Sequence, residues 1–119
     1  MTIRIYHNPR CSKSRKTLEL LQASGVQPEV VAYLEAPPGE ETLLELAGLL
    51  ARPLKKLLRT GEEEFKAAQD SLDLDDDKLL ARWLQQHPRV LERPIVVDSA
   101  SGRAIIGRPP ENVLELLPK

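Results

Sequence analysis

The feature that most constrains the fold is a change of hydrophobic period around residues 6–15, YHNPRCSKSR. Before this segment, Ile3 and Ile5 alternate with polar neighbours, which is typical of a half-buried strand. An Asn-Pro pair then interrupts the strand, and apolar residues recur at helical spacing until Gly25. The sequence therefore predicts a strand, a loop and a helix that begins near Cys11, the only cysteine of the chain, and places that cysteine in the first turn.

A cysteine at this position is predicted to be reactive. The backbone N–H groups at a helix N-terminus carry partial positive charge and favour an anion such as a thiolate. Arg10, Lys13 and Arg15 add three cations nearby, so we expect the pKa of Cys11 to fall below the roughly 8.5 of a free thiol. The same groups would hold an oxyanion beside the sulfur. The alternative is a small buried hydrophobic residue, which the adjacent cations disfavour.

The rest of the chain predicts one α/β domain over residues 1–119. A β-rich run at 28–34 completes a β-α-β unit with parallel strands. A helical insertion of about residues 40–88 follows, then an antiparallel hairpin and a last helix, which gives the order β-α-β, insertion, β-β-α. The predicted elements are helices at 40–51, 53–58, 62–69 and 75–86, strands at 93–98 and 103–106, and a final helix opened by Pro109-Pro110.

The helical patterns also predict which side chains face inward. The buried side of the 75–86 helix is predicted to hold Leu79, Leu80, Trp83 and Leu84, and that of the last helix Val113, Leu114, Leu116 and Leu117. The acidic run at 73–77 could suggest a cation site, but its place at the start of a helix favours stabilisation of that helix end.

Composition restricts the setting in which the protein works. The chain has 119 residues, 29% of them charged, and a net charge of -1, which fits one soluble domain and gives no support to nucleic-acid binding. It lacks a membrane-spanning run and a signal-peptide pattern, so we expect a cytoplasmic protein that does not engage membranes. The near-neutral charge and the lack of an obvious exposed apolar stripe make a monomer the default expectation. A single cysteine fits a reducing compartment, and any disulfide must involve another molecule.

Four motifs in order resemble the glutaredoxin-dependent arsenate reductase (ArsC) family of the thioredoxin-fold superfamily. They are residues 7–15 around the cysteine, Arg59, the ERPIVV segment at 92–97 and the GRPP segment at 107–110. The resemblance covers essentially the whole chain. It implies a thioredoxin-like α/β fold with a mixed four-stranded sheet.

The resemblance also implies roles for individual residues. Cys11 matches the nucleophile that attacks arsenate, and Arg59, Arg93 and Arg108 match the arginines that hold the oxyanion. Guanidinium groups suit this task because they stay charged and fork onto oxyanions.

Other matched residues surround the nucleophile. His7 matches a histidine that tunes the thiol, and Pro94 matches the cis-proline beside the cysteine. Ser14, Arg15 and Pro94 are predicted to line the substrate site, and the hydroxyls of Ser12 and Ser14 could donate hydrogen bonds to the thiolate.

The Cys-x-x-Ser pattern limits the mechanism, because Ser14 cannot act as a resolving thiol. By resemblance the external thiols are glutathione, as a co-substrate, and then glutaredoxin, with no bound cofactor and no metal. Two alternatives stay open. One is a glutathione-dependent thiol-disulfide reductase of another substrate, and the other is an Spx-type redox-sensing regulator that binds RNA polymerase.

Overall fold

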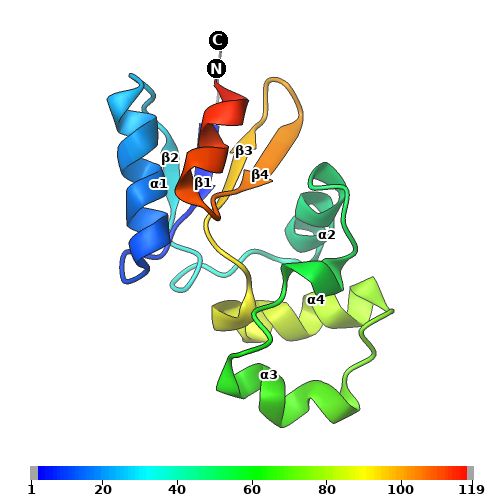
Figure 1. The fold of residues 1–119 in the computed structure, drawn as a ribbon. Coiled ribbons are helices and arrows are strands. Elements are labelled where there is room, and N and C mark those ends of the chain that lie inside the picture. The colour runs from blue at the N-terminus through cyan, green and yellow to red at the C-terminus, as the bar shows by residue number, and fades with distance from the viewer. Residues whose placement is uncertain (1–2, 118–119) are drawn as a thin grey trace. The chain divides into compact units, whose positions relative to one another are not determined.

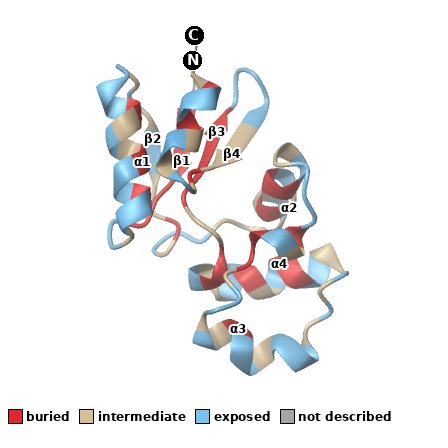
Figure 2. Ribbon diagram, in the orientation of Figure 1, coloured by how far each residue is buried: buried red, intermediate tan, exposed pale blue. Residues whose placement is uncertain are grey.

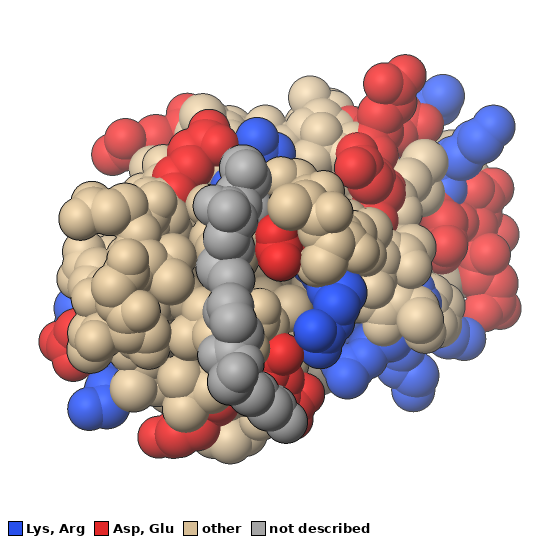
Figure 3. All heavy atoms as spheres, turned by 90° about the horizontal axis from the view of Figure 1, so that it is seen from above, with Lys and Arg blue, Asp and Glu red and all other residues tan. Residues whose placement is uncertain are grey.

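The computed structural model describes residues 3–117 and divides the chain into two compact units. The first combines the chain up to Ala36 with the chain from Arg93 onward, and the second is Pro37–Glu92. Within residues 3–117, no helix is long and apolar enough to cross a membrane. Acidic and basic side chains are interspersed on the face drawn in Figure 3.

The first unit is built on a four-stranded sheet of order β2-β1-β3-β4 (Figure 1). The strands are β1 (Ile3–Tyr6), β2 (Glu29–Val31), β3 (Ile95–Asp98) and β4 (Arg103–Ile106). β1 pairs parallel with β2 and antiparallel with β3, and β3 and β4 form the antiparallel hairpin. The mixed sheet and the thioredoxin-like α/β fold are therefore confirmed.

One helix and one 3₁₀ helix pack against each other and onto the same face of this sheet. These are α1 (Ser12–Ala23) and η4 (Pro110–Leu116), which lie side by side in Figure 1. Their buried side chains form one cluster with those of β1 and β3. Figure 2 colours the buried residues of these elements red. The core cluster consists of Ile3, Ile5, Leu21, Val96, Val113 and Leu116. Because these side chains are all apolar, hydrophobic burial holds the helix that carries the cysteine loop to the sheet.

The predicted strand, loop and helix at the N-terminus are present, with one shift in detail. Cys11 is the N-cap of α1 rather than a residue of its first turn. The helix gives way at Gly25, whose φ of +82° lies in the left-handed region that glycine adopts without a Cβ penalty. β2 is shorter than the predicted 28–34, because the chain turns directly after Val31, with Ala36 N–H donating to Ala32 O at 2.9 Å.

The last predicted helix is a 3₁₀ helix, and this changes which residues it buries. A 3₁₀ helix has three residues per turn, so residues i and i+3 share a face. Val113 and Leu116 are accordingly buried, whereas Leu114 is 43% exposed. The prediction that Leu114 faces inward was wrong because it assumed the α-helical period.

The second unit is helical, as the predicted insertion requires. It contains α2 (Glu40–Leu49), α3 (Glu63–Ala68) and α4 (Asp77–Gln86), together with 3₁₀ helices at Leu54–Leu57, Gln69–Ser71 and Pro88–Val90. Its buried leucines include Leu43, Leu46, Leu54, Leu57, Leu80 and Leu84. The shared burial of leucines from α2, α4 and the first 3₁₀ helix gives this unit a core of its own.

Two predictions about α4 have different outcomes. Leu79 is 50% exposed, so its predicted burial was wrong. Leu80 and Leu84 are buried as predicted, and Ala81 is buried with them. The acidic run does stabilise the helix start, because the Asp76 carboxylate caps α4 and accepts the N–H groups of Lys78 and Leu79.

Candidate active site

Cys11 lies where β1 passes into α1, in a loop fixed by backbone hydrogen bonds. Its N–H donates to Asn8 O at 3.0 Å, and its carbonyl accepts the Arg15 N–H at 3.0 Å as the first turn of α1 forms. The side chain of Cys11 is half-buried and its thiol is free. The sulfur is thus held in place at the helix N-terminus while remaining accessible.

The environment of Cys11 favours the thiolate. Burial raises the pKa of Cys11, but the backbone N–H groups of Ser14 and Lys13 and the guanidinium of Arg93 outweigh burial, so the pKa is lowered overall. The predicted effect of the helix N-terminus is present. The guanidinium that contributes to this shift, that of Arg93, comes from the far part of the sequence.

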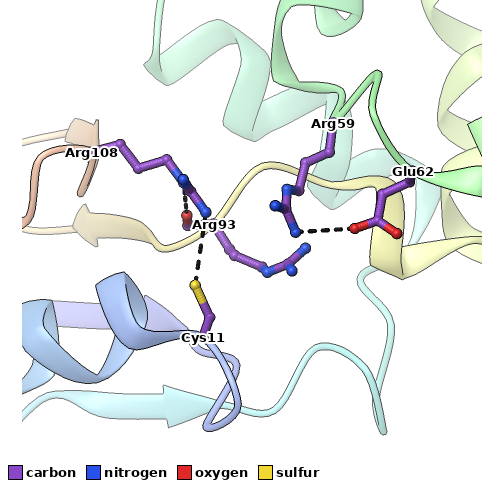
Figure 4. Close-up of polar contacts among 5 residues, drawn as sticks. All are labelled: Cys11, Arg59, Glu62, Arg93 and Arg108. Carbon is purple, nitrogen blue, oxygen red and sulfur yellow. Dashed lines mark hydrogen bonds and ion pairs between the residues drawn. The ribbon is translucent and has the colours of Figure 1, made fainter.

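Arg108 also reaches the sulfur, as Figure 4 shows. Its Nη2 lies 3.7 Å from Cys11 Sγ, and its Nε donates to the Arg93 carbonyl oxygen at 2.7 Å. The hydrogen bond to Arg93 fixes the direction in which the Arg108 guanidinium points. Two of the three predicted arginines therefore lie at Cys11 within the first unit.

The register of the β3–β4 hairpin explains why these arginines meet. Ile95 pairs with Ile106, so the two Arg-Pro elements that flank the pair lie opposite each other. The pairing extends past the strands, because Gly107 N–H donates to Pro94 O at 2.9 Å. The Arg93–Pro94 bond is cis, as the resemblance implies, and Arg108–Pro109 is also cis.

His7 is coupled to Cys11 through Ser14. His7 Nδ1 lies 2.6 Å from Ser14 Oγ, and the Asn8 N–H donates to the same oxygen at 3.0 Å. The Ser14 side chain is fully buried. Its hydroxyl thus contacts His7 and Asn8, and the group of Ser14 that acts on the sulfur is the backbone N–H.

The surroundings of His7 lower its pKa. Burial lowers the pKa of His7, and the positive charge of Arg15 lowers it further. Arg15 itself points back to the loop, where Nη1 donates to Pro9 O at 2.8 Å. Arg15 thus braces the cysteine loop, and its role in substrate binding stays a prediction.

Arg59 belongs to the second unit, and its surroundings there are well defined. Its N–H donates to Val90 O at 2.6 Å, next to a bridge between Leu58 and Leu91. Its Nη1 forms an ion pair with Glu62 Oε1 at 3.1 Å (Figure 4). That Arg59 joins Cys11 around an oxyanion stays a prediction.

Sequence reasoning missed two residues at these sites. Asn8 accepts the Cys11 N–H with its carbonyl and the Arg10 N–H with Oδ1 at 2.9 Å, so it shapes the cysteine loop. Its signal was the Asn-Pro pair, which is typical of such turns. Glu62 pairs with Arg59, and the signal was the spacing of opposite charges at i and i+3.

Comparison with known proteins places these features in a family. The ArsC family model matches residues 6–116. The chain is 48% identical over 120 residues to the uncharacterized protein YfgD of Escherichia coli K12, covering 97% of this chain and 96% of that protein. It is 43% identical over 117 residues to an arsenate reductase of Neisseria meningitidis, covering 97% of each. A solved arsenate reductase from Vibrio cholerae superimposes with a TM-score of 0.90 at 43% identity over 98% of each chain. The chain belongs to the ArsC family.

Proposed function

We propose that this protein is an arsenate reductase in which Cys11 is the nucleophile. The observation that carries the proposal is the placement of Arg108 Nη2 at 3.7 Å from Cys11 Sγ, together with the lowering of the Cys11 pKa by Arg93. A thiolate beside two guanidinium groups can attack an oxyanion that those groups hold. The relatives named arsenate reductase support the choice of arsenate.

The proposed chemistry transfers two electrons from two thiols to arsenic. The Cys11 thiolate forms a sulfur–arsenic bond as one oxygen of arsenate leaves as water. A glutathione thiol then attacks the Cys11 sulfur, the sulfur–arsenic bond breaks, and its electron pair stays on arsenic, which is released as arsenite. Cys11 is left in a mixed disulfide with glutathione. A thiol of glutaredoxin attacks the glutathione sulfur and regenerates Cys11.

Each residue has a defined part in this scheme. Arg93 and Arg108, with Arg59 as the third arginine, hold and neutralise the oxyanion. The amides of Lys13 and Ser14 stabilise the thiolate of Cys11 both before attack and as the leaving group of the mixed disulfide. The lone cysteine supports the use of external thiols, because the chain has no second thiol to supply the remaining electron.

The test is arsenite formation from arsenate with glutathione, glutaredoxin and an NADPH-linked recycling system. We expect Cys11→Ser to abolish turnover and Arg93→Ala to lower kcat/KM by about 10²- to 10³-fold, the usual effect of removing one oxyanion donor. Arg103→Ala is the matched control, because Arg103 is exposed and its Nη2 donates to Glu115 O. The proposal fails if the wild type forms no arsenite, or if Arg103→Ala and Arg93→Ala are equally impaired.

A further inference from the structure

The ion pair between Arg59 and Glu62 is not accounted for by the chemistry above. We infer that Glu62 is an internal competitor for the oxyanion, one that weakens the hold of Arg59 on substrate and so sets the affinity of the site. The inference rests on the proposed function, in which Arg59 is one of the arginines that bind the oxyanion.

The backbone around Arg59 keeps the two side chains in register. Arg59 N–H donates to Val90 O at 2.6 Å, and Glu62 N–H donates to Arg59 O at 3.1 Å across the turn between them. Arg59 Nη1 and Glu62 Oε1 are 3.1 Å apart, which is hydrogen-bonding distance (Figure 4). The turn therefore holds a carboxylate against the guanidinium before any ligand arrives.

Glu62 stands at the start of α3, but its side chain pairs with Arg59 and does not cap the helix. Glu62 is the N-cap of α3, yet its side chain makes no capping hydrogen bond. The N-cap side chains that accept helix N–H groups are chiefly those of Ser, Thr, Asp and Asn. Here the carboxylate is directed to Arg59 instead, so the contact is not a by-product of helix capping.

The burial of the pair determines how strongly it competes. The side chains of Arg59 and Glu62 are 27% and 25% exposed, so water screens the interaction less than at an open surface. A carboxylate and a tetrahedral oxyanion seek the same guanidinium donors. An oxyanion that binds Arg59 must share or displace Glu62 and meets its negative charge. From the usual worth of such pairs we expect affinity to be reduced roughly threefold to fivefold.

The experiment separates the charge of Glu62 from its shape. Glu62→Gln keeps the length and the acceptor oxygen but removes the charge. Glu63→Gln is the matched control, because Glu63 is exposed, lies one residue further along and is in the first turn of the same helix. Arsenate binding is measured by calorimetry in the Cys11→Ser background, which cannot turn over. We expect Glu62→Gln to lower the Kd for arsenate roughly threefold to fivefold and Glu63→Gln to leave the Kd unchanged.

Two further measurements complete the test. In the Arg59→Ala background, Glu62→Gln should no longer increase the affinity for arsenate, because the Glu62 carboxylate then has no Arg59 guanidinium to pair with. With Cys11 present, Glu62→Gln should lower KM for arsenate and leave kcat within about twofold, since the ground state and the transition state gain equally.

The outcomes distinguish this inference from the proposed function. An unchanged or higher Kd in Glu62→Gln, an equal gain in Glu63→Gln, or no measurable arsenate binding in any variant overturns the inference. A gain that persists without Arg59 also overturns it. Failure of the proposed function is seen separately, as the absence of arsenite formation by the wild type.

Discussion

Gly107→Ala should destabilise the protein, because there is no room for a methyl group at this position. A Cβ built at Gly107 would lie 2.5 Å from Thr17 Oγ1, 2.8 Å from Pro94 Cγ and 3.1 Å from Thr17 Cγ2. Neither neighbour can move freely. Thr17 is fully buried with its hydroxyl donating to Lys13 O at 2.8 Å, and Pro94 is a buried ring. Because both contacts are rigid, we expect a cost in the upper part of the overpacking range, about 2–3 kcal/mol.

An opposing effect reduces this cost. Replacing glycine by alanine restricts the unfolded chain and stabilises the folded state by about 0.4–1 kcal/mol where the backbone permits it. Gly107 does not have the positive φ of Gly25 and Gly102, so the backbone does permit alanine. The net loss in the free energy of unfolding is therefore about 1–2.6 kcal/mol.

Urea unfolding followed by circular dichroism measures this loss. Gly48→Ala is the control, because Gly48 lies in α2 with nothing within 4 Å of its Cβ position, so the same substitution should stabilise by about 0.5–1 kcal/mol. Thr17→Ala removes two of the three close contacts, so Gly107→Ala should cost less in that background. If Gly107→Ala is neutral while Gly48→Ala stabilises, the steric reasoning is refuted.

Two pH-dependent predictions follow from the groups around the thiol. The rate of Cys11 alkylation by iodoacetamide should rise with pH at a midpoint below that of a free thiol. Arg93→Ala should move this midpoint to higher pH, because a charge that favours the thiolate is lost. An unchanged midpoint would contradict this role of Arg93. His7 has a folded pKa below its ordinary value of 6.5, so its neutral form contributes stability that is present above pH 6.5 and is lost as the pH falls through the folded pKa. Urea unfolding between pH 7.5 and pH 5 should accordingly show a larger loss for the wild type than for His7→Gln, and equal losses would contradict the assignment.

The sequence predicted the elements well where a hydrophobic period was long and chemically distinct. The strand before Cys11, the helix after it and the β3–β4 hairpin are all present within a residue or two. Burial was predicted less well at Leu79 and Leu114, which are both exposed. Leucine spacing alone cannot tell an α-helix from a 3₁₀ helix, and it leaves the edges of a buried stripe undefined.

The cation that lowers the pKa of Cys11 could not be predicted from its distance along the sequence. Sequence proximity singled out Arg10, Lys13 and Arg15 as the cations that would activate Cys11, and these side chains are exposed. Charges in water are screened, whereas a half-buried guanidinium in hydrogen-bonding contact is screened much less. Arg93 is such a group, and it comes to the sulfur because β3 pairs with β1, with Ile95 opposite Tyr6 at the end of the strand that leads to Cys11.

Ser14 acts on Cys11 through its backbone N–H and on the structure of the cysteine loop through its hydroxyl. Its backbone N–H lowers the pKa of Cys11, while its buried hydroxyl bonds His7 Nδ1 and accepts the Asn8 N–H. The hydroxyl therefore ties the end of β1 to the first turn of α1, and this fixes the direction of the N–H that faces the sulfur. A Cys-x-x-Ser pattern has a hydroxyl where a Cys-x-x-Cys pair has the resolving thiol. In this chain the serine instead keeps the thiolate site ordered, and in the proposed function the second thiol comes from outside the chain.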